Sequence, residues 1–96
     1  MGGCDFGTKA KGSSAQDAFN TAVEEARYES GHGGYTGTIA EKHTFTLISV
    51  PEGQDPVAFA DGLVDKDDKR VSDKWGPAGC VKVKEGEWYF FGIASC

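Results

Sequence analysis

The chain has 96 residues, of which 39% are hydrophobic and 26% are charged, and its 10 basic and 15 acidic side chains give a formal net charge of −5. This length fits a single domain, residues 1–96, and no segment has the roughly 20 apolar residues of a membrane span or the basic flank and apolar run of a signal peptide. Without a signal peptide or a membrane span, we expect a cytoplasmic protein that does not bind a membrane. Because basic residues are few, we also expect no direct binding to a nucleic acid.

The first third of the chain predicts an edge element followed by a helix. Residues 1–12 are rich in glycine and are typical of a short edge strand or an ordered arm. From Ser13 onwards apolar residues recur at helical spacing, and a capping pair, Ser13 with Gln16 or Ser14 with Asp17, precedes them. The helix has an alanine-rich apolar face that can lie close to a sheet, formed by Ala15, Ala18, Phe19, Ala22, Val23 and Ala26.

The middle of the chain predicts two strands and a second helix. After the glycine-rich segment 31–37, β-branched and aromatic residues favour strands at Thr38–Ala40 and Thr44–Val50. Asp55 followed by Pro56 is a start signal for a shorter helix, which ends near the charged residues 65–70.

A hairpin is expected at the end of the chain. Valines alternate with lysines from Val81 to Lys84, Glu85–Glu87 supplies the turn, and the returning strand is Trp88–Ala94. The predicted fold is therefore α+β, with a small antiparallel sheet of four to five strands, two helices on one face and the order (β)αββαββ. If residues 3–6 form a strand, a variant of the ferredoxin-like order is an alternative.

The last predicted strand is apolar on both faces. Alternation turns Trp88, Phe90 and Ala94 to one side and Tyr89, Phe91 and Ile93 to the other. The second face needs a cover, which residues 65–79 folded back, the amino-terminal arm with Phe6, or another polypeptide can supply. If a second copy or a partner protein covers it, the binding residues include Trp88, Tyr89 and Phe91.

The glycine-rich segment is a second candidate site. Successive backbone N–H groups there could form an anion nest for a nucleotide-type ligand, with ring stacking and hydrogen bonds from its side chains. The segment runs from a helix into a strand, opposite to the usual phosphate loop, so a helix terminator with tight turns is the simpler interpretation. The candidate residues are His32, Gly33, Gly34, Tyr35, Thr36 and Thr38.

No catalytic or metal site is predicted, and no cofactor is expected. The two histidines, His32 and His43, lack a nucleophile signature around them, and a hydrolase that pairs one of them with Cys80 is the least favoured hypothesis. Three cysteines form no CxxC pair, and Cys80 is expected to be a buried thiol. Cys4 and Cys96 could meet if their strands are neighbours, but a cytosolic setting argues against a stable bridge.

Residues 24–42, EEARYESGHGGYTGTIAEK, carry a resemblance to a family. The chain resembles small uncharacterised proteins of tailed bacteriophages, notably those of actinobacterial hosts, over roughly residues 12–50, where those proteins carry an AxxAFxxxVEEARYExGHGGYTGTIAEK-like segment. The resemblance implies a phage protein in the host bacterial cytoplasm that binds and blocks a host enzyme or defence component.

The sequence thus predicts a non-enzymatic protein-binding module whose partner is a host protein or a second copy of the chain. The alternative is a small-ligand binding protein of the nucleotide type that uses the loop from Gly31 to Thr38.

Overall fold

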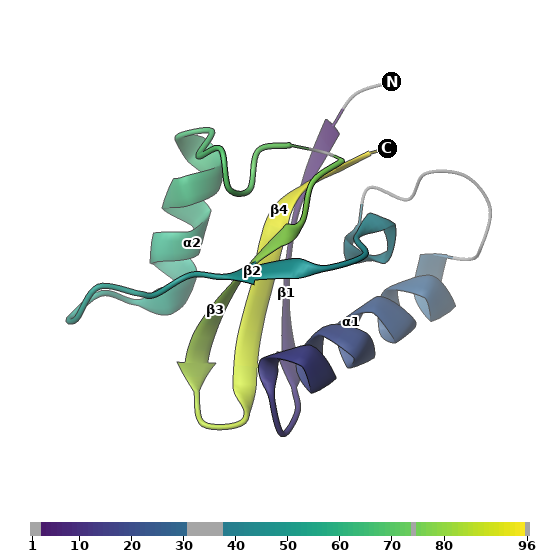
Figure 1. Ribbon diagram of the computed structural model, residues 1–96, viewed down its shortest axis with the longest axis horizontal. Helices are drawn as coiled ribbons and strands as arrows, with labels where there is room; N and C mark the ends of the chain where they lie inside the picture. The colour runs from purple at the N-terminus through teal and green to yellow at the C-terminus, as the bar shows by residue number, and fades with distance from the viewer. Residues whose placement is uncertain (1–2, 31–37, 74, 96) are drawn as a thin grey trace.

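Four strands form a mixed sheet with a helix on each face (Figure 1). The structure is a computed structural model that describes residues 3–30, 38–73 and 75–95. The strand order is β1-β4-β3-β2, in which β4 is antiparallel to both neighbours and β2 is parallel to β3. The elements are β1 (Gly3–Lys11), α1 (Ala15–Ser30), the 3-10 helix η1 (Ile39–Glu41), β2 (Phe45–Leu47), α2 (Pro56–Asp65), β3 (Ala78–Lys84) and β4 (Glu87–Ser95). The predicted α+β class is confirmed.

Both helices begin where the capping residues indicate. At α1 the Ser14 hydroxyl accepts a hydrogen bond from the Asp17 backbone N–H at 3.2 Å, and the Asp17 carboxylate accepts one from the Ser13 N–H at 3.0 Å. At α2 the Asp55 carboxylate accepts from the Ala58 N–H at 3.0 Å, with Pro56 in the first turn. Side chains thus satisfy backbone donors that a helix start leaves without intrahelical partners.

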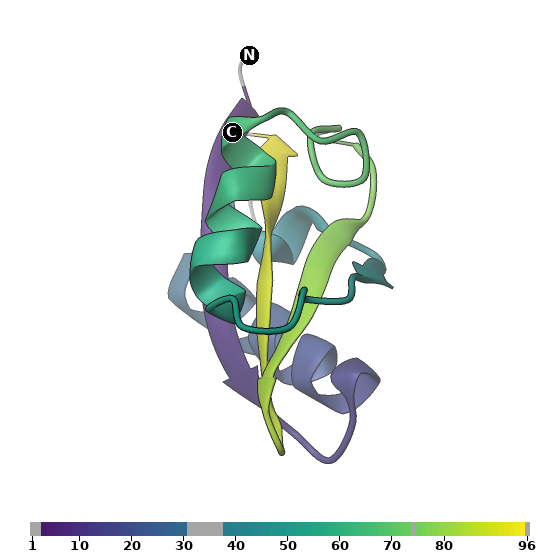
Figure 2. The ribbon, with the colours of Figure 1, turned by 90° about the vertical axis from the view of Figure 1, so that its left-hand side faces the viewer.

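The two helices lie on opposite faces of the sheet, so the prediction of two helices on one face is wrong. Figure 2 shows α2 in front of the sheet and α1 behind it. On the α1 side the rings of Phe19, Phe45 and Phe90 form a triangle with centroids 5.1 to 5.6 Å apart. On the α2 side Leu63 belongs to the buried cluster that covers Phe91. Each face of β4 therefore has its own core.

The ferredoxin-like variant and the purely antiparallel sheet are also wrong. The predicted strand Thr38–Ala40 is replaced by η1, because the Thr38 side chain accepts a hydrogen bond from the Ala40 N–H at 3.2 Å and closes a tight turn. The following strand is short, Phe45–Leu47, and pairs with β3 in parallel. The chain between β2 and β3 passes through α2, and such a crossover returns in the parallel direction.

The second face of β4 is covered from within the chain. Besides α2, the segment 65–79 contributes Val71, which is 1% exposed and whose carbonyl oxygen accepts a hydrogen bond from the Ile93 N–H at 3.2 Å. Of the three covers that the sequence allows, the folded-back segment is present, but its anchor is Val71, and Trp75 is 63% exposed. An aromatic row open to a partner is absent from the described part of β4.

Of the two described cysteines, one agrees with the prediction and the other does not. Cys80 is a fully buried free thiol, as predicted. Cys4, on β1, is disulfide-bonded, so the prediction that it stays unbridged is wrong. Cys96, the cysteine that Cys4 could meet if their strands were neighbours, lies outside the described residues. Within the described ranges, no helix is long and apolar enough to cross a membrane.

Gly79 and Gly62 provide a matched test of this packing. A methyl group at Gly79 would lie 2.6 Å from Val71 Cγ1 and 2.7 Å from Phe91 Cζ, whereas one at Gly62, in α2, meets nothing within 4 Å. We expect Gly79→Ala to lower the free energy of unfolding by about 1 to 3 kcal/mol and Gly62→Ala to raise it by about 0.5 to 1 kcal/mol. Urea unfolding measures both, and a neutral Gly79→Ala would contradict the two-sided core.

Candidate functional site

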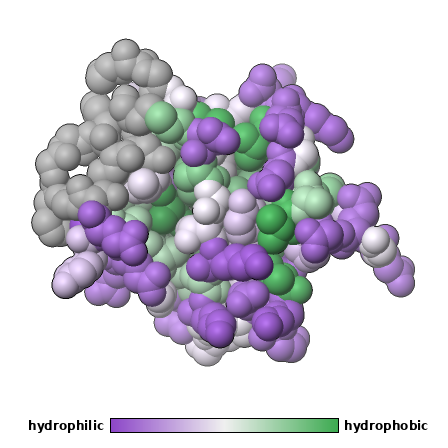
Figure 3. Space-filling model, turned by 180° about the vertical axis from the view of Figure 1, so that it is seen from behind, coloured by the Kyte–Doolittle hydropathy of each residue, from purple (hydrophilic) through white to green (hydrophobic). Residues whose placement is uncertain are grey.

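β1 is a long, open edge of the sheet. It has nine residues, whereas β2 at the opposite edge has three. In Figure 2 β1 runs along the left border of the sheet, and no strand of the described chain pairs with its outer side. Figure 3 shows the molecule from behind, the side on which β1 lies, and there hydrophobic residues are interspersed with hydrophilic ones. Backbone N–H and C=O groups on such an edge can pair with another strand.

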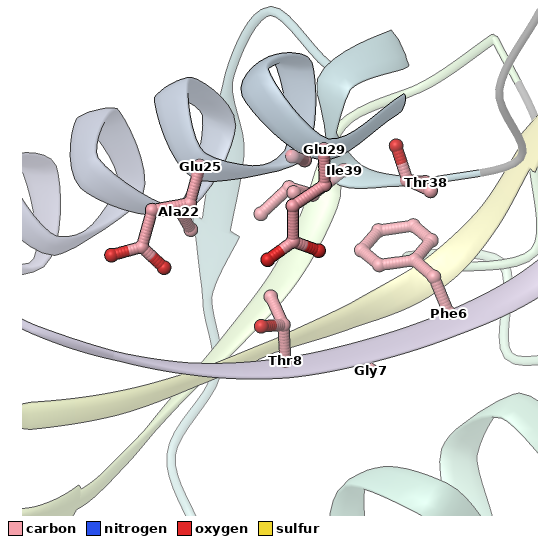
Figure 4. A pocket seen from close by; sticks show the side chains of 9 residues that line it. Phe6, Gly7, Thr8, Ala22, Glu25, Glu29, Thr38 and Ile39 are labelled. Carbon is pink, nitrogen blue, oxygen red and sulfur yellow. The ribbon is translucent and has the colours of Figure 1, made fainter. Parts of the chain in front are cut away.

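A hollow lies on the face of β1 turned to α1, and we call it the α1-side hollow (Figure 4). The Glu29 side chain points from α1 towards Thr8, and the Phe6 ring points from β1 towards Thr38. Its volume is about 190 Å³, below the roughly 300 Å³ at which pockets for whole small molecules begin. Its lining consists of Phe6, Gly7, Thr8, Ala22, Glu25, Ala26, Glu29, Thr38 and Ile39.

A second hollow lies on the opposite face of the same strand, towards α2. This α2-side hollow has a volume of about 350 Å³ and is lined by Asp5, Phe6, Gly7, Asp61, Val64, Asp65 and Tyr89. Phe6 and Gly7 line both hollows, so at this point β1 is the partition between them. The middle of the edge strand is accordingly flanked by open space on both faces.

Tyr89 determines the shape of the α2-side hollow. Its side chain lies against Gly7, where any Cβ would overlap the Tyr89 hydroxyl. That hydroxyl donates a hydrogen bond to Asp61 Oδ1 at 3.1 Å and so connects β4 to α2. Burial, the hydrogen bond to Asp61 and the negative charges of Asp61 and Asp5 raise the pKa of Tyr89 to about 12. The phenol therefore stays protonated at neutral pH.

Acidic side chains surround both hollows. On α1, Glu25 and Glu29 are four residues apart, and on α2 so are Asp61 and Asp65, a spacing that places each pair on one helix face. Asp5 on β1 adds a fifth carboxylate. Five negative charges around the middle of one edge strand favour a positively charged occupant.

Two of the predicted site residues line these hollows. Thr38 contributes to the α1-side hollow and Tyr89 to the α2-side hollow. The other loop candidates, His32, Gly33, Gly34, Tyr35 and Thr36, lie outside the described residues.

Trp88 and Phe91 are 7% and 0% exposed, respectively. Their predicted role as exposed binding residues is therefore wrong, and the physical reason is that α1 and α2 cover opposite faces of β4.

The catalytic alternative gains no support from its residues. Burial raises the pKa of the Cys80 thiol to about 12, which opposes formation of a nucleophilic thiolate at neutral pH. His43 is exposed, next to residues of α1 and Lys42. Within the described ranges, no group of three or more His, Cys, Asp or Glu residues could hold a metal ion.

The carboxylates of the hollows were not among the residues predicted for the site. The four-residue spacing of Glu25 with Glu29 and of Asp61 with Asp65 was visible in the sequence, but it marks a helix face and not what that face meets. Only the placement of β1 between the two helices brings these pairs and Asp5 together.

Comparisons with known proteins add no relative to this picture. No family model, no curated protein sequence and no solved structure matches the chain.

We expect Tyr89 to lose its phenol proton at a higher pH than an ordinary tyrosine. Because the folded pKa of this phenol, about 12, lies above the ordinary value of about 10, its contribution to stability is complete below pH 10 and is lost as the pH rises towards 12. Ultraviolet absorbance of phenolate should show a late component that Tyr89→Phe removes and Tyr28→Phe, at an exposed tyrosine, leaves in place. A late component that persists in Tyr89→Phe would contradict this assignment.

Proposed function

We propose that this chain is a non-enzymatic protein-binding module that accepts an extended segment of a partner along the free edge of β1. One observation carries the proposal. The nine-residue edge strand β1 has a hollow on each of its two faces, and both hollows lie at Phe6 and Gly7. A strand added to such an edge gains main-chain hydrogen bonds, while its alternating side chains enter pockets on the two faces.

The charge of the site supports a basic partner. Neighbouring residues of an incoming strand point to opposite faces, so two adjacent basic residues would place one side chain in each hollow. There they would meet Glu25 and Glu29 on one face and Asp5, Asp61 and Asp65 on the other. The net charge of −5 adds long-range attraction for such a partner.

The resemblance to tailed-phage proteins suggests a host protein as the partner and inhibition of a host enzyme or defence system as the outcome. A host cytoplasmic location belongs to the same proposal. The disulfide at Cys4 is more typical of oxidising surroundings, so it does not favour that location.

A peptide pair tests the edge directly. The probe is an eight-residue peptide of alternating threonine and valine with two adjacent lysines at its centre, and the control carries two glutamates there. We expect the lysine peptide to bind and to shift the amide resonances of β1, since its backbone would pair with that edge. Binding of both peptides with equal affinity, or binding that leaves β1 unperturbed, would rule the proposal out.

Single-residue variants identify which carboxylates contribute to the affinity for the lysine peptide. Glu29→Gln and Asp65→Asn each remove one carboxylate from a different hollow, and each should weaken lysine-peptide binding roughly two- to fivefold, as expected for a partly exposed charge pair. Glu52→Gln, an exposed change outside both hollows, is the matched control and should leave the affinity unchanged. Equal effects of all three variants would point to general charge attraction and against the hollows.

A further inference from the structure

We infer that the edge of β1 pairs with the same edge of a second copy of this chain, which gives a continuous eight-stranded sheet across a twofold axis. The inference rests on the proposed function, because it uses the same edge of β1, which a second copy would occupy when no other partner is bound. The four strands of each copy, in the order β1-β4-β3-β2, would place the two β1 strands side by side at the centre.

Symmetry restricts the way in which the two strands can meet. When two copies of one edge strand pair side by side, they are antiparallel only if a twofold axis normal to the sheet relates the two copies. Such an axis leaves both α2 helices on one face of the joined sheet and both α1 helices on the other. Residues directly opposite each other then point to the same face. With Gly7 on the axis, Gly3 pairs with Lys11 of the second copy, and all nine residues of β1 are used.

This full-length register is also complementary in charge. It sets Asp5 opposite Lys9 of the second copy and, by symmetry, Lys9 opposite Asp5, so both cross-strand pairs have opposite charges. Shifts of two residues shorten the overlap, and shifts of four residues oppose Asp5 to Asp5 or Lys9 to Lys9. The register with the most backbone pairing is thus one that the charged side chains favour.

The surroundings of Asp5 strengthen the pair. Asp5 and Gly7 line the α2-side hollow, and alternation places Lys9 on the same face of β1. Lys9 of the second copy would therefore lie beside Asp5 across the paired edges, close to Asp61 and Asp65 of the same hollow. At the axis, Gly7 faces Gly7 without a side chain from either strand. One lysine from each copy thus supplies the positive charge that the acidic hollow lacks.

A charge exchange between Asp5 and Lys9 tests the inference. Light scattering coupled to size exclusion should show a dimer for the native chain, and its dissociation constant should rise about tenfold or more in Asp5→Lys and in Lys9→Asp, because each creates like-charged cross-strand pairs. The double variant Asp5→Lys/Lys9→Asp restores opposite charges and should regain the dimer. Glu52→Lys and Lys69→Asp make the same charge changes at exposed sites away from β1 and should remain dimeric.

Circular dichroism and thermal unfolding establish that each variant is folded, and a non-reducing gel establishes that the dimer is not covalent. A native chain that stays monomeric up to about millimolar concentration, a disulfide-linked dimer, or a dimer indifferent to the single reversals would overturn the inference. A monomer that still binds the lysine peptide at β1 would overturn only the self-pairing. A monomer that does not bind it would overturn the proposed function as well.

Discussion

β4 carries large apolar side chains on both faces, and the placement of the other elements follows from the need to bury them. Phe90 and Phe91 are neighbours in sequence, point to opposite sides of the sheet and are both fully buried. A strand of this kind is stable only in the interior of a sheet that is covered on both sides. The position of β4 between β1 and β3, with α1 on one face and α2 on the other, follows from that requirement.

Sealing β4 leaves β1 only partly covered. α2 packs against β3 and β4, so the face of β1 turned to α2 stays open except where Tyr89 reaches across Gly7 to Asp61. On the other face α1 contacts β1 through small side chains, such as Ala22 and Ala26, which leave the α1-side hollow. The core does not cover the outer edge of β1. That edge therefore keeps unpaired backbone groups, open space on both faces and nearby carboxylates, all of which a partner can use.

Local structure followed from the sequence more closely than the arrangement of the elements did. Ser14, Asp55 and Pro56 act within one helical turn, so their effect is readable from neighbouring residues alone. Periodicity shows that a helix has an apolar face but not which side of the sheet that face covers, so the sequence alone does not separate α1 and α2 onto opposite faces. At Thr38 a side-chain hydrogen bond to the backbone of Ala40 closes a turn where β propensity favoured a strand. For the site, Tyr89 was identified for its aromatic ring, whereas Asp5 and the helix carboxylates depend on contacts between distant segments.

Amide hydrogen exchange, followed residue by residue at several protein concentrations, separates the sealed interior of the sheet from its open edge. We expect the amides of β4 to stay protected at every concentration, because this strand is paired with β1 and β3 and covered on both faces within one chain. Protection of the outward-facing amides of β1 should increase with concentration as the edge becomes paired. Outward-facing β1 amides that exchange at the same rate at all concentrations, or β4 amides whose protection depends on concentration, would contradict the pairing of the β1 edges and the two-sided cover of β4.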